Sequence, residues 1–193
     1  EALLKRDAVQ LDKLKSFGGS GLYALYYVGS NPTYGALAAE NVDGKFRWPI
    51  YVGKAEGART RKGAAKREAV ANTSLYSRIK EHRESIQLAS NLDVSDFFCR
   101  ALVVNDIWIP LGEALILANF SPPWNRWLDG FGNHDPGSGR YNGFQPRWDV
   151  LHPGRPWAVK CKPRAETAAQ LDVELRRHLA NTPIPKRPEI PAL

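Results

Sequence analysis

Two tyrosines lie beside glycines in two segments of the chain that are similar to each other. Tyr23 ends a Gly-Leu-Tyr tripeptide, and Tyr51 begins a Tyr-Val-Gly tripeptide. A glycine lets the backbone turn or approach a ligand closely, and neighbours on paired strands lie about 5 Å apart. A single tyrosine in a strand usually packs in the core. The two phenols are therefore candidates for chemistry only if other polar groups join them.

Arg78 and His82 are the next candidates, because they lie four residues apart in a segment with apolar residues at helical spacing. Residues i and i+4 share one face of a helix, so both side chains could contact the same phosphate. Arginine stays charged and binds phosphate oxygens with a planar fork, which suits it to neutralise charge during phosphoryl transfer. The alternative is an ordinary solvated helix surface.

Glu113 is the only acidic residue in the apolar stretch from Ile107 to Phe120. A carboxylate in such surroundings is costly unless a cation or a donor satisfies it, so Glu113 is a candidate metal ligand. Magnesium accepts one or two carboxylates together with water and substrate oxygens. The alternative is a glutamate in the first turn of a helix, stabilised by the macrodipole. Asn125 follows twelve residues later, after a pair of prolines.

These residues must be positioned by strands and helices that the apolar patterns predict. Runs rich in aromatic and branched residues predict strands, and periodic apolar residues predict helices. We expect strands over 21–29, 48–53 and 96–105, helices over 2–16, 75–88, 111–120 and 165–180, a long loop over 30–47, a basic loop over 54–67, an ordered functional loop over 130–154 and a proline-rich tail over 183–191.

The order of these residues along the chain resembles the GIY-YIG nucleases. Residues 21–23 and 51–53 match the two halves of the signature, and an arginine on the next helix, a glutamate and an asparagine follow in the family's order. The resemblance covers residues 21–126. It implies an α+β fold with a mainly antiparallel three-stranded sheet flanked by helices. On this basis residues 1–193 form one endonuclease domain, with an N-terminal helix in 1–19 and a C-terminal extension of helices and loops, 127–193, for DNA contacts or dimerisation.

The resemblance also implies roles for the candidate residues in hydrolysing a phosphodiester. Tyr23 would be the general base, and His82 would accept its proton or act as the base itself. Tyr51 would orient the water or the phosphate, and Arg78 would neutralise the developing charge. Glu113 would hold Mg²⁺, for which Mn²⁺ would substitute, and Asn125 would fix the neighbouring loop. The stretch between Gly53 and Arg78 is longer than in compact members, which leaves Arg61 and Arg67 as alternatives to Arg78.

Composition supports a polyanionic partner. Lys and Arg outnumber Asp and Glu by 27 to 20, for a net charge of +7, and a hydrophobic content of 43% is enough for a core. Two cysteines, Cys99 and Cys161, are too few for a disulfide framework and indicate a reducing compartment. No apolar run approaches the roughly 20 residues that cross a bilayer. We therefore expect a cytoplasmic protein with no membrane association.

DNA recognition should come from residues outside the core motif. The candidate regions are the 30–47 loop, the basic stretch over 54–67 and the 130–154 segment, and the last two carry side-chain types that contact phosphates and base edges. The candidates are Lys54, Arg59, Arg61, Lys62, Arg67, Asn133, His134, Arg140, Asn142, Gln145 and Arg147. For any one of them, ordinary loop polarity or a phosphate contact is an equal alternative.

The layout is most similar to the branch of GIY-YIG type II restriction endonucleases that cuts the palindrome CCGCGG. Cutting a palindrome on both strands implies two active sites and hence a two-fold homodimer on double-stranded DNA. A homing or repair nuclease of the same superfamily is one alternative. A DNA-binding protein that retains the fold without catalysis is another.

Overall fold

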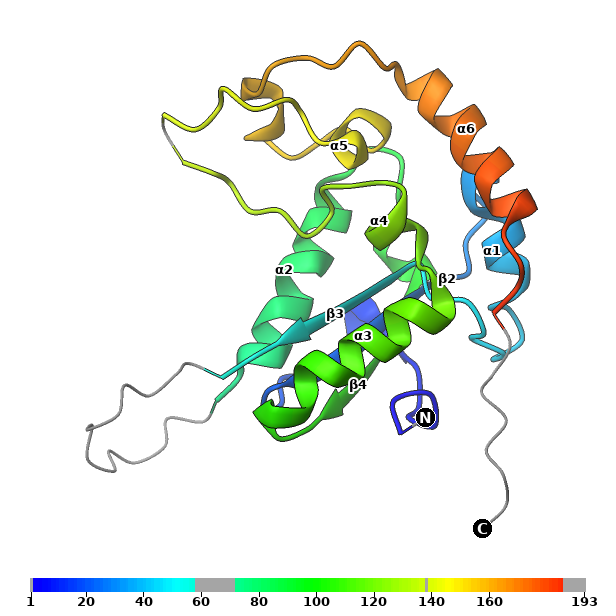
Figure 1. The fold of residues 1–193 in the computed structure, drawn as a ribbon, viewed down its shortest axis with the longest axis vertical. Helices are drawn as coiled ribbons and strands as arrows, with labels where there is room; N and C mark the ends of the chain where they lie inside the picture. The colour runs from blue at the N-terminus through cyan, green and yellow to red at the C-terminus, as the bar shows by residue number, and fades with distance from the viewer. Residues whose placement is uncertain (1, 58–71, 138, 186–193) are drawn as a thin grey trace.

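The computed structural model describes residues 2–57, 72–137 and 139–185, and its α+β fold confirms the predicted class (Figure 1). Four of the predicted basic DNA contacts, Arg59, Arg61, Lys62 and Arg67, lie outside these residues. The elements in chain order are β1 (Val9–Gln10), η1 (Leu11–Lys13), β2 (Gly21–Tyr27), η2 (Pro32–Tyr34), α1 (Gly35–Ala39), β3 (Tyr51–Ala55), α2 (Ser74–Leu88), η3 (Val94–Asp96), β4 (Phe97–Val103), η4 (Asp106–Trp108), α3 (Ile109–Phe120), α4 (Pro123–Arg126), α5 (Arg147–Leu151), η5 (Ala158–Lys160) and α6 (Ala168–Asn181).

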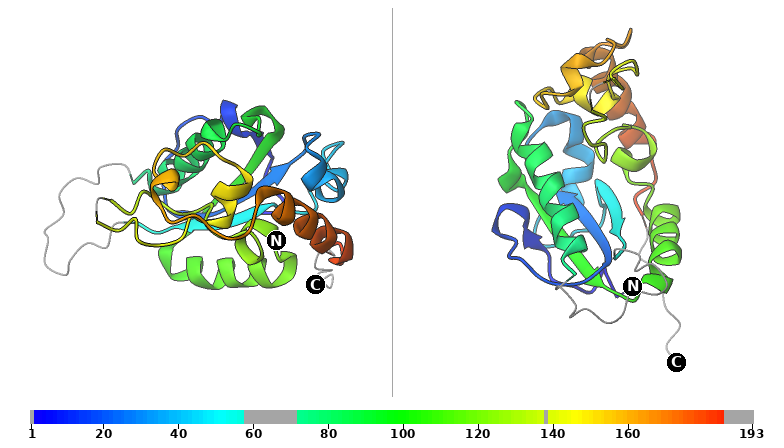
Figure 2. Two further views of the ribbon diagram at one scale, coloured as in Figure 1. Left: turned by 90° about the horizontal axis from the view of Figure 1, so that it is seen from above. Right: turned by 90° about the vertical axis from the view of Figure 1, so that its left-hand side faces the viewer.

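The described sheet has four antiparallel strands in the order β1-β4-β2-β3. All seven residues of β2 are buried, and alternate side chains enter two separate apolar clusters. Tyr23, Leu25 and Tyr27 face the larger cluster under α2, whereas Leu22 and Ala24 face the cluster under α3. The two helices accordingly lie on opposite sides of the sheet (Figure 2). Because β3 is an edge strand, side chains from the two faces of the sheet can approach each other around its outer edge.

The predicted N-terminal helix over 2–16 is wrong. Residues Val9 and Gln10 instead pair with β4 as a short edge strand, which raises the strand count from three to four. Leu3 is buried in the α3 cluster and Leu11 in the α2 cluster, on opposite faces of the sheet. One helix could not have placed both side chains there, so tertiary burial overrides the helical spacing.

Two other boundaries also differ from expectation. The second strand begins at Tyr51 rather than at Trp48, because the side chain of Asn41 bonds both the N–H and the C=O of Trp48 at 2.9 and 2.8 Å. The predicted loop over 30–47 contains η2 and α1. The predicted helices over 75–88, 111–120 and 165–180 are present as α2, α3 and α6.

Residues 127–137 and 139–181 lie beyond one end of the sheet, where α6 packs against α1 and η2 (Figure 1). The described residues of the segment 130–154 are irregular except for α5, and the part around Phe131 and Gly132 contacts α2. Within the described residues, no helix is both long and apolar enough to cross a membrane.

Candidate active site

Tyr23 and His82 form the buried centre of the candidate site. Tyr23 is in the middle of the sheet on β2, and His82 is on the inner face of α2 between the apolar residues Ile79 and Ile86. The exposed fractions of the two side chains are 0% and 1%. The phenolic oxygen lies 2.5 Å from Nε2 of the imidazole. The structure thus joins two predicted site residues by a direct hydrogen bond.

Gly53 explains how the phenol of Tyr23 fits beside the neighbouring strand. The two residues are paired in the β2–β3 ladder, so they share one face of the sheet. A Cβ on Gly53 would lie 2.2 Å from the Tyr23 hydroxyl and 2.4 Å from Cζ, which is far inside contact distance. The glycine of the Tyr-Val-Gly tripeptide is needed because the ring of Tyr23 occupies the space of its side chain.

Tyr51, on the same face of β3, completes an aromatic cluster. Its ring meets the ring of His82 edge-on at 5.0 Å and that of Phe131 at 4.9 Å, and lies 6.2 Å from that of Tyr23. Phe131 also stacks on His82 at 4.6 Å. Tyr51 is only partly buried, whereas the imidazole is enclosed. Access from solvent to this cluster therefore passes Tyr51 before it reaches His82.

Arg78 provides the positive charge at the cluster. Its Nη2 donates to the backbone carbonyl of Gly132 at 2.7 Å, and its Nη1 contacts Glu81 at 2.9 Å and also His134. Burial raises the pKa of both phenols, and the charge of Arg78 opposes this rise in each. The predicted Arg78 is thus beside the tyrosines, and its carboxylate partner on α2 is exposed enough to be exchanged for a phosphate.

The pKa values of the central pair favour neutral groups. Burial raises the pKa of Tyr23 well above its usual value, the nearby Tyr51 raises it further, and Arg78 opposes both effects. Burial, followed by repulsion from Arg78, holds the pKa of His82 well below its usual value. At neutral pH the phenol therefore keeps its proton, and it is hydrogen-bonded to a neutral imidazole.

Glu113 reaches the site from the other face of the sheet. It projects from α3 toward β3, where one of its carboxylate oxygens lies 3.2 Å from the ammonium group of Lys54. Its negative charge also raises the pKa of Tyr51, although burial is the larger cause of that shift. Lys54 contacts Glu56 as well, at 3.2 Å. The candidate metal ligand and the aromatic cluster therefore meet at the same edge strand.

The described residues do not surround Glu113 with a full set of protein ligands for a metal ion. Within the described residues, there is no group of three or more His, Cys, Asp or Glu side chains that could hold a metal ion. A closed structural metal site is thus absent from that part of the chain. A single carboxylate fits Mg²⁺ when water and the oxygens of a bound phosphate fill the other positions.

Asn125 acts on the backbone of β3. Its side-chain amide accepts from the N–H of Val52 and donates to the C=O of Val52, each at 2.8 Å. Next to it, the N–H of Trp124 donates to the C=O of Ile50 at 3.0 Å. Asn125 therefore caps the free edge of the strand that carries Tyr51 and Gly53. It holds this strand, whereas the sequence predicted that it would fix a loop.

A turn over residues 130–133 is part of the site, although the sequence pattern did not reveal it as such. Phe131 supplies the ring that stacks on His82, and Gly132 supplies the carbonyl that holds Arg78. A Cβ on Gly132 would lie 2.8 Å from the Tyr51 hydroxyl. The available signal was the Gly-Phe-Gly tripeptide, in which a bulky aromatic ring stands between two residues without side chains.

The structure separates the predicted DNA contacts in the C-terminal extension into two groups. Arg140 and Asn142 are exposed, as are Asn133 and His134. In contrast, Arg147 bonds Glu166 through Nε at 2.8 Å and stacks over Trp127, and Gln145 pairs with Lys162 through its backbone. A base contact by Arg147 would require its ion pair to break.

Comparison with known proteins adds one finding. Residues 15–179, most of the chain, match the family model described as the Eco29kI GIY-YIG domain. No curated protein matches the sequence.

Proposed function

The chain belongs to the Eco29kI family of GIY-YIG nucleases, and on this premise we propose that it is a Mg²⁺-dependent type II restriction endonuclease. It cuts double-stranded DNA at a GC-rich palindrome of the CCGCGG type and acts in the cytoplasm. The observation that supports hydrolysis best is the meeting of Tyr23, Tyr51 and Arg78 on one face of β3 with Glu113 beside its edge.

The proposed reaction is attack of water on the scissile phosphorus with cleavage of the bond to the 3′ oxygen. The water proton passes to the phenol cluster, and the leaving 3′ oxygen takes up a proton from solvent. Nε2 of His82 is bonded to Tyr23 and the imidazole ring lies against Phe131, so His82 is placed to receive a proton from Tyr23. Tyr23 is therefore our preferred base, with His82 as the acceptor of its proton.

Deprotonating Tyr23 requires positive charge, because burial raises its pKa in the free protein. Arg78 is already placed to supply part of this charge. In the free protein its Nη1 is shared by Glu81 and His134. Phosphate oxygens that replace the Glu81 carboxylate would keep the guanidinium beside both phenols and neutralise the charge of the transition state.

Glu113 would hold the magnesium ion, which when bound supplies positive charge beside the leaving oxygen. Lys54 is well placed to hold this carboxylate turned toward β3 before the ion arrives, because its ammonium group lies 3.2 Å from a carboxylate oxygen of Glu113. Mn²⁺ is expected to substitute, because it accepts the same oxygen ligands.

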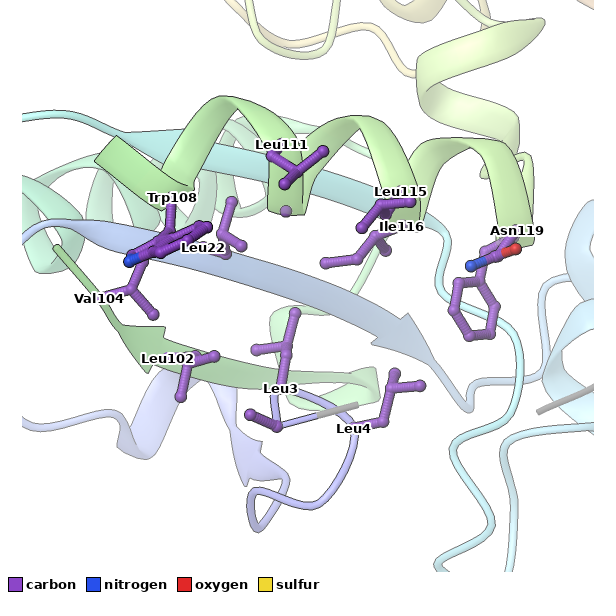
Figure 3. A pocket seen from close by; sticks show the side chains of 13 residues that line it. Leu3, Leu4, Leu22, Leu102, Val104, Trp108, Leu111, Leu115, Ile116 and Asn119 are labelled. Carbon is purple, nitrogen blue, oxygen red and sulfur yellow. The ribbon is translucent and has the colours of Figure 1, made fainter. Parts of the chain in front are cut away.

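We also propose that the enzyme is a homodimer that pairs through the outer face of α3. Ile107, Trp108, Leu111 and Leu115 are each more than half exposed, and Leu111 and Leu115 are one turn apart on α3. Figure 3 shows part of this face beside a cavity of about 410 Å³ that Leu3 and Leu4 also line. Four large apolar side chains exposed close together in the chain, two of them on successive turns of α3, are typical of a protein–protein contact surface.

A second copy is the occupant that the proposed reaction favours, since cutting both strands requires two active sites. Replacing Leu111 and Leu115 by glutamate should yield a monomer by light scattering, and the monomer should nick plasmid instead of linearising it. Val173→Glu on α6, at a residue that is 54% exposed, is the matched control. A monomeric wild-type protein, or a dimer that survives both changes, would refute this interface.

The function itself is tested by incubating plasmid DNA with the protein and Mg²⁺. Discrete bands that map to GC-rich palindromes are the expected result, and EDTA should abolish them. A smear would indicate a nonspecific nuclease, and cutting at one long or damaged site would favour a homing or repair enzyme. Binding without any cutting would favour a non-catalytic DNA-binding protein.

A further inference from the structure

Arg155 is a buried arginine in the C-terminal extension, and all five of its N–H donors are satisfied. Its side chain is 2% exposed. Nε and Nη2 bond the two carboxylate oxygens of Asp149, the first at 2.6 Å. The three remaining N–H groups donate to backbone carbonyls, namely those of Gly130 at 2.9 Å and of Phe131 and Asn133 at 3.1 Å.

The guanidinium is also held between two aromatic faces. Its carbon lies 4.7 Å from the ring centre of Trp148 and 4.7 Å from that of Trp157. A planar cation fits between two rings and can bond in its own plane at the same time, which an ammonium group cannot do. Asp149, at 1% exposure, neutralises the charge.

The three carbonyls that Arg155 binds belong to the turn that touches the catalytic candidates. Between them, Gly132 offers its own carbonyl to Arg78, and Phe131 places its ring on His82 and Tyr51. Gly130 has a φ of +102°, and a Cβ there would lie 2.1 Å from Pro146. The conformation of this turn therefore depends on hydrogen bonds from residues outside the turn, and Arg155 provides three of them.

We propose that Arg155 is a positioning residue, which through its three bonds to the 130–133 turn sets Arg78, His82 and Tyr51 in their reactive geometry. This inference rests on the proposed nuclease function. It assigns the C-terminal extension a part in the chemistry, in addition to any DNA contacts. Arg155 does not touch the substrate, and its effect passes entirely through the turn.

Two variants test this role. Arg155→Lys keeps the charge but has no planar fork for three carbonyls. The double variant Arg155→Met/Asp149→Leu replaces the ion pair with apolar side chains of similar volume, an exchange that many proteins tolerate without loss of stability. Arg176→Met/Asp172→Leu removes an ion pair on α6 by the same substitutions and is the matched control.

The expected result is a fall in kcat of about 100-fold in both Arg155 variants, with KM for DNA nearly unchanged, because a shift of about 1 Å in a catalytic group has that effect. The control should retain wild-type kcat. Wild-type kcat in a folded double variant would overturn the proposal. Unfolding of both Arg155 variants in a thermal melt would overturn it as well, because Arg155 would then serve only stability.

A second measurement does not depend on cleavage. The ring protons of His82 lie under Phe131, so their NMR shifts report the position of the turn. These shifts should move in both Arg155 variants and stay unchanged in the control. If the wild-type protein cuts no DNA but these shifts move, the proposed function fails and the positioning role stands. Unchanged shifts would refute the positioning role by themselves.

Discussion

Replacing Asn125 by alanine should loosen the outer edge of β3. The edge position of this strand leaves the N–H and C=O of Val52 without a strand partner, and the Asn125 amide binds both at 2.8 Å. Each such bond contributes about 1 kcal/mol net, and a partly buried group left without a partner costs about 1–3 kcal/mol. Because solvent can reach part of this edge, we expect a loss of about 2 kcal/mol in the free energy of unfolding.

Asn125→Asp refines this test. The carboxylate can still accept from the N–H of Val52, but its second oxygen faces the carbonyl oxygen where the amide donated. The aspartate should therefore be no better than alanine, although it differs from asparagine in one atom. Asn119→Ala, at an exposed asparagine on α3, is the control and should leave stability within about 0.5 kcal/mol.

Urea denaturation measures the stability of these variants, and cleavage assays below their melting temperature measure turnover. Since Val52 lies between Tyr51 and Gly53, kcat should fall by about 10- to 100-fold while DNA binding is retained. An Asn125→Ala protein with wild-type stability and kcat would refute the reasoning, because water would then replace the amide without consequence.

Three further predictions concern charge. Glu113→Gln should abolish cleavage but retain DNA binding in a filter assay, and a wild-type rate would remove Glu113 from the site. Arg78→Ala should stop turnover, whereas an inactive Arg67→Ala beside an active Arg78→Ala would move the catalytic arginine into the basic segment. Finally, burial lowers the pKa of His82, and lowers that of His152 to about 3. Unfolded histidines take up protons near pH 6.5, so stability is complete above that pH and falls below it, by up to about 1.4 kcal/mol per pH unit for each histidine. A flat stability profile between pH 7 and 5, measured in urea, would contradict this.

Arg155 connects the C-terminal extension to the turn that contacts the candidate active site. Residues 127–193 were expected to contact DNA or a second subunit, and Arg140 and Asn142 remain exposed for that purpose. The bonds from Arg155 hold the turn whose Gly132 carbonyl accepts from Arg78, so this extension contacts the candidate site.

The sequence by itself determined the features that depend on local patterns. The apolar periodicity of α2 and α6 and the aromatic run of β2 were sufficient because each is long and buries one clear set of side chains. The order of Tyr23, Tyr51, Arg78, Glu113 and Asn125 was sufficient to indicate the GIY-YIG family. Residue types and their order are visible in the sequence, and recognising them requires no distance between side chains.

Only the tertiary structure decided how the two faces of the sheet are used. The N-terminal segment has helical spacing but splits its leucines between the two clusters, and the edge position of β3 lets Glu113 approach from the face opposite Tyr23. The carbonyls bound by Arg155 are backbone groups, which every residue possesses, so no sequence pattern could mark them. Contacts of this kind arise from chain packing over long separations, and local spacing contains no information about them.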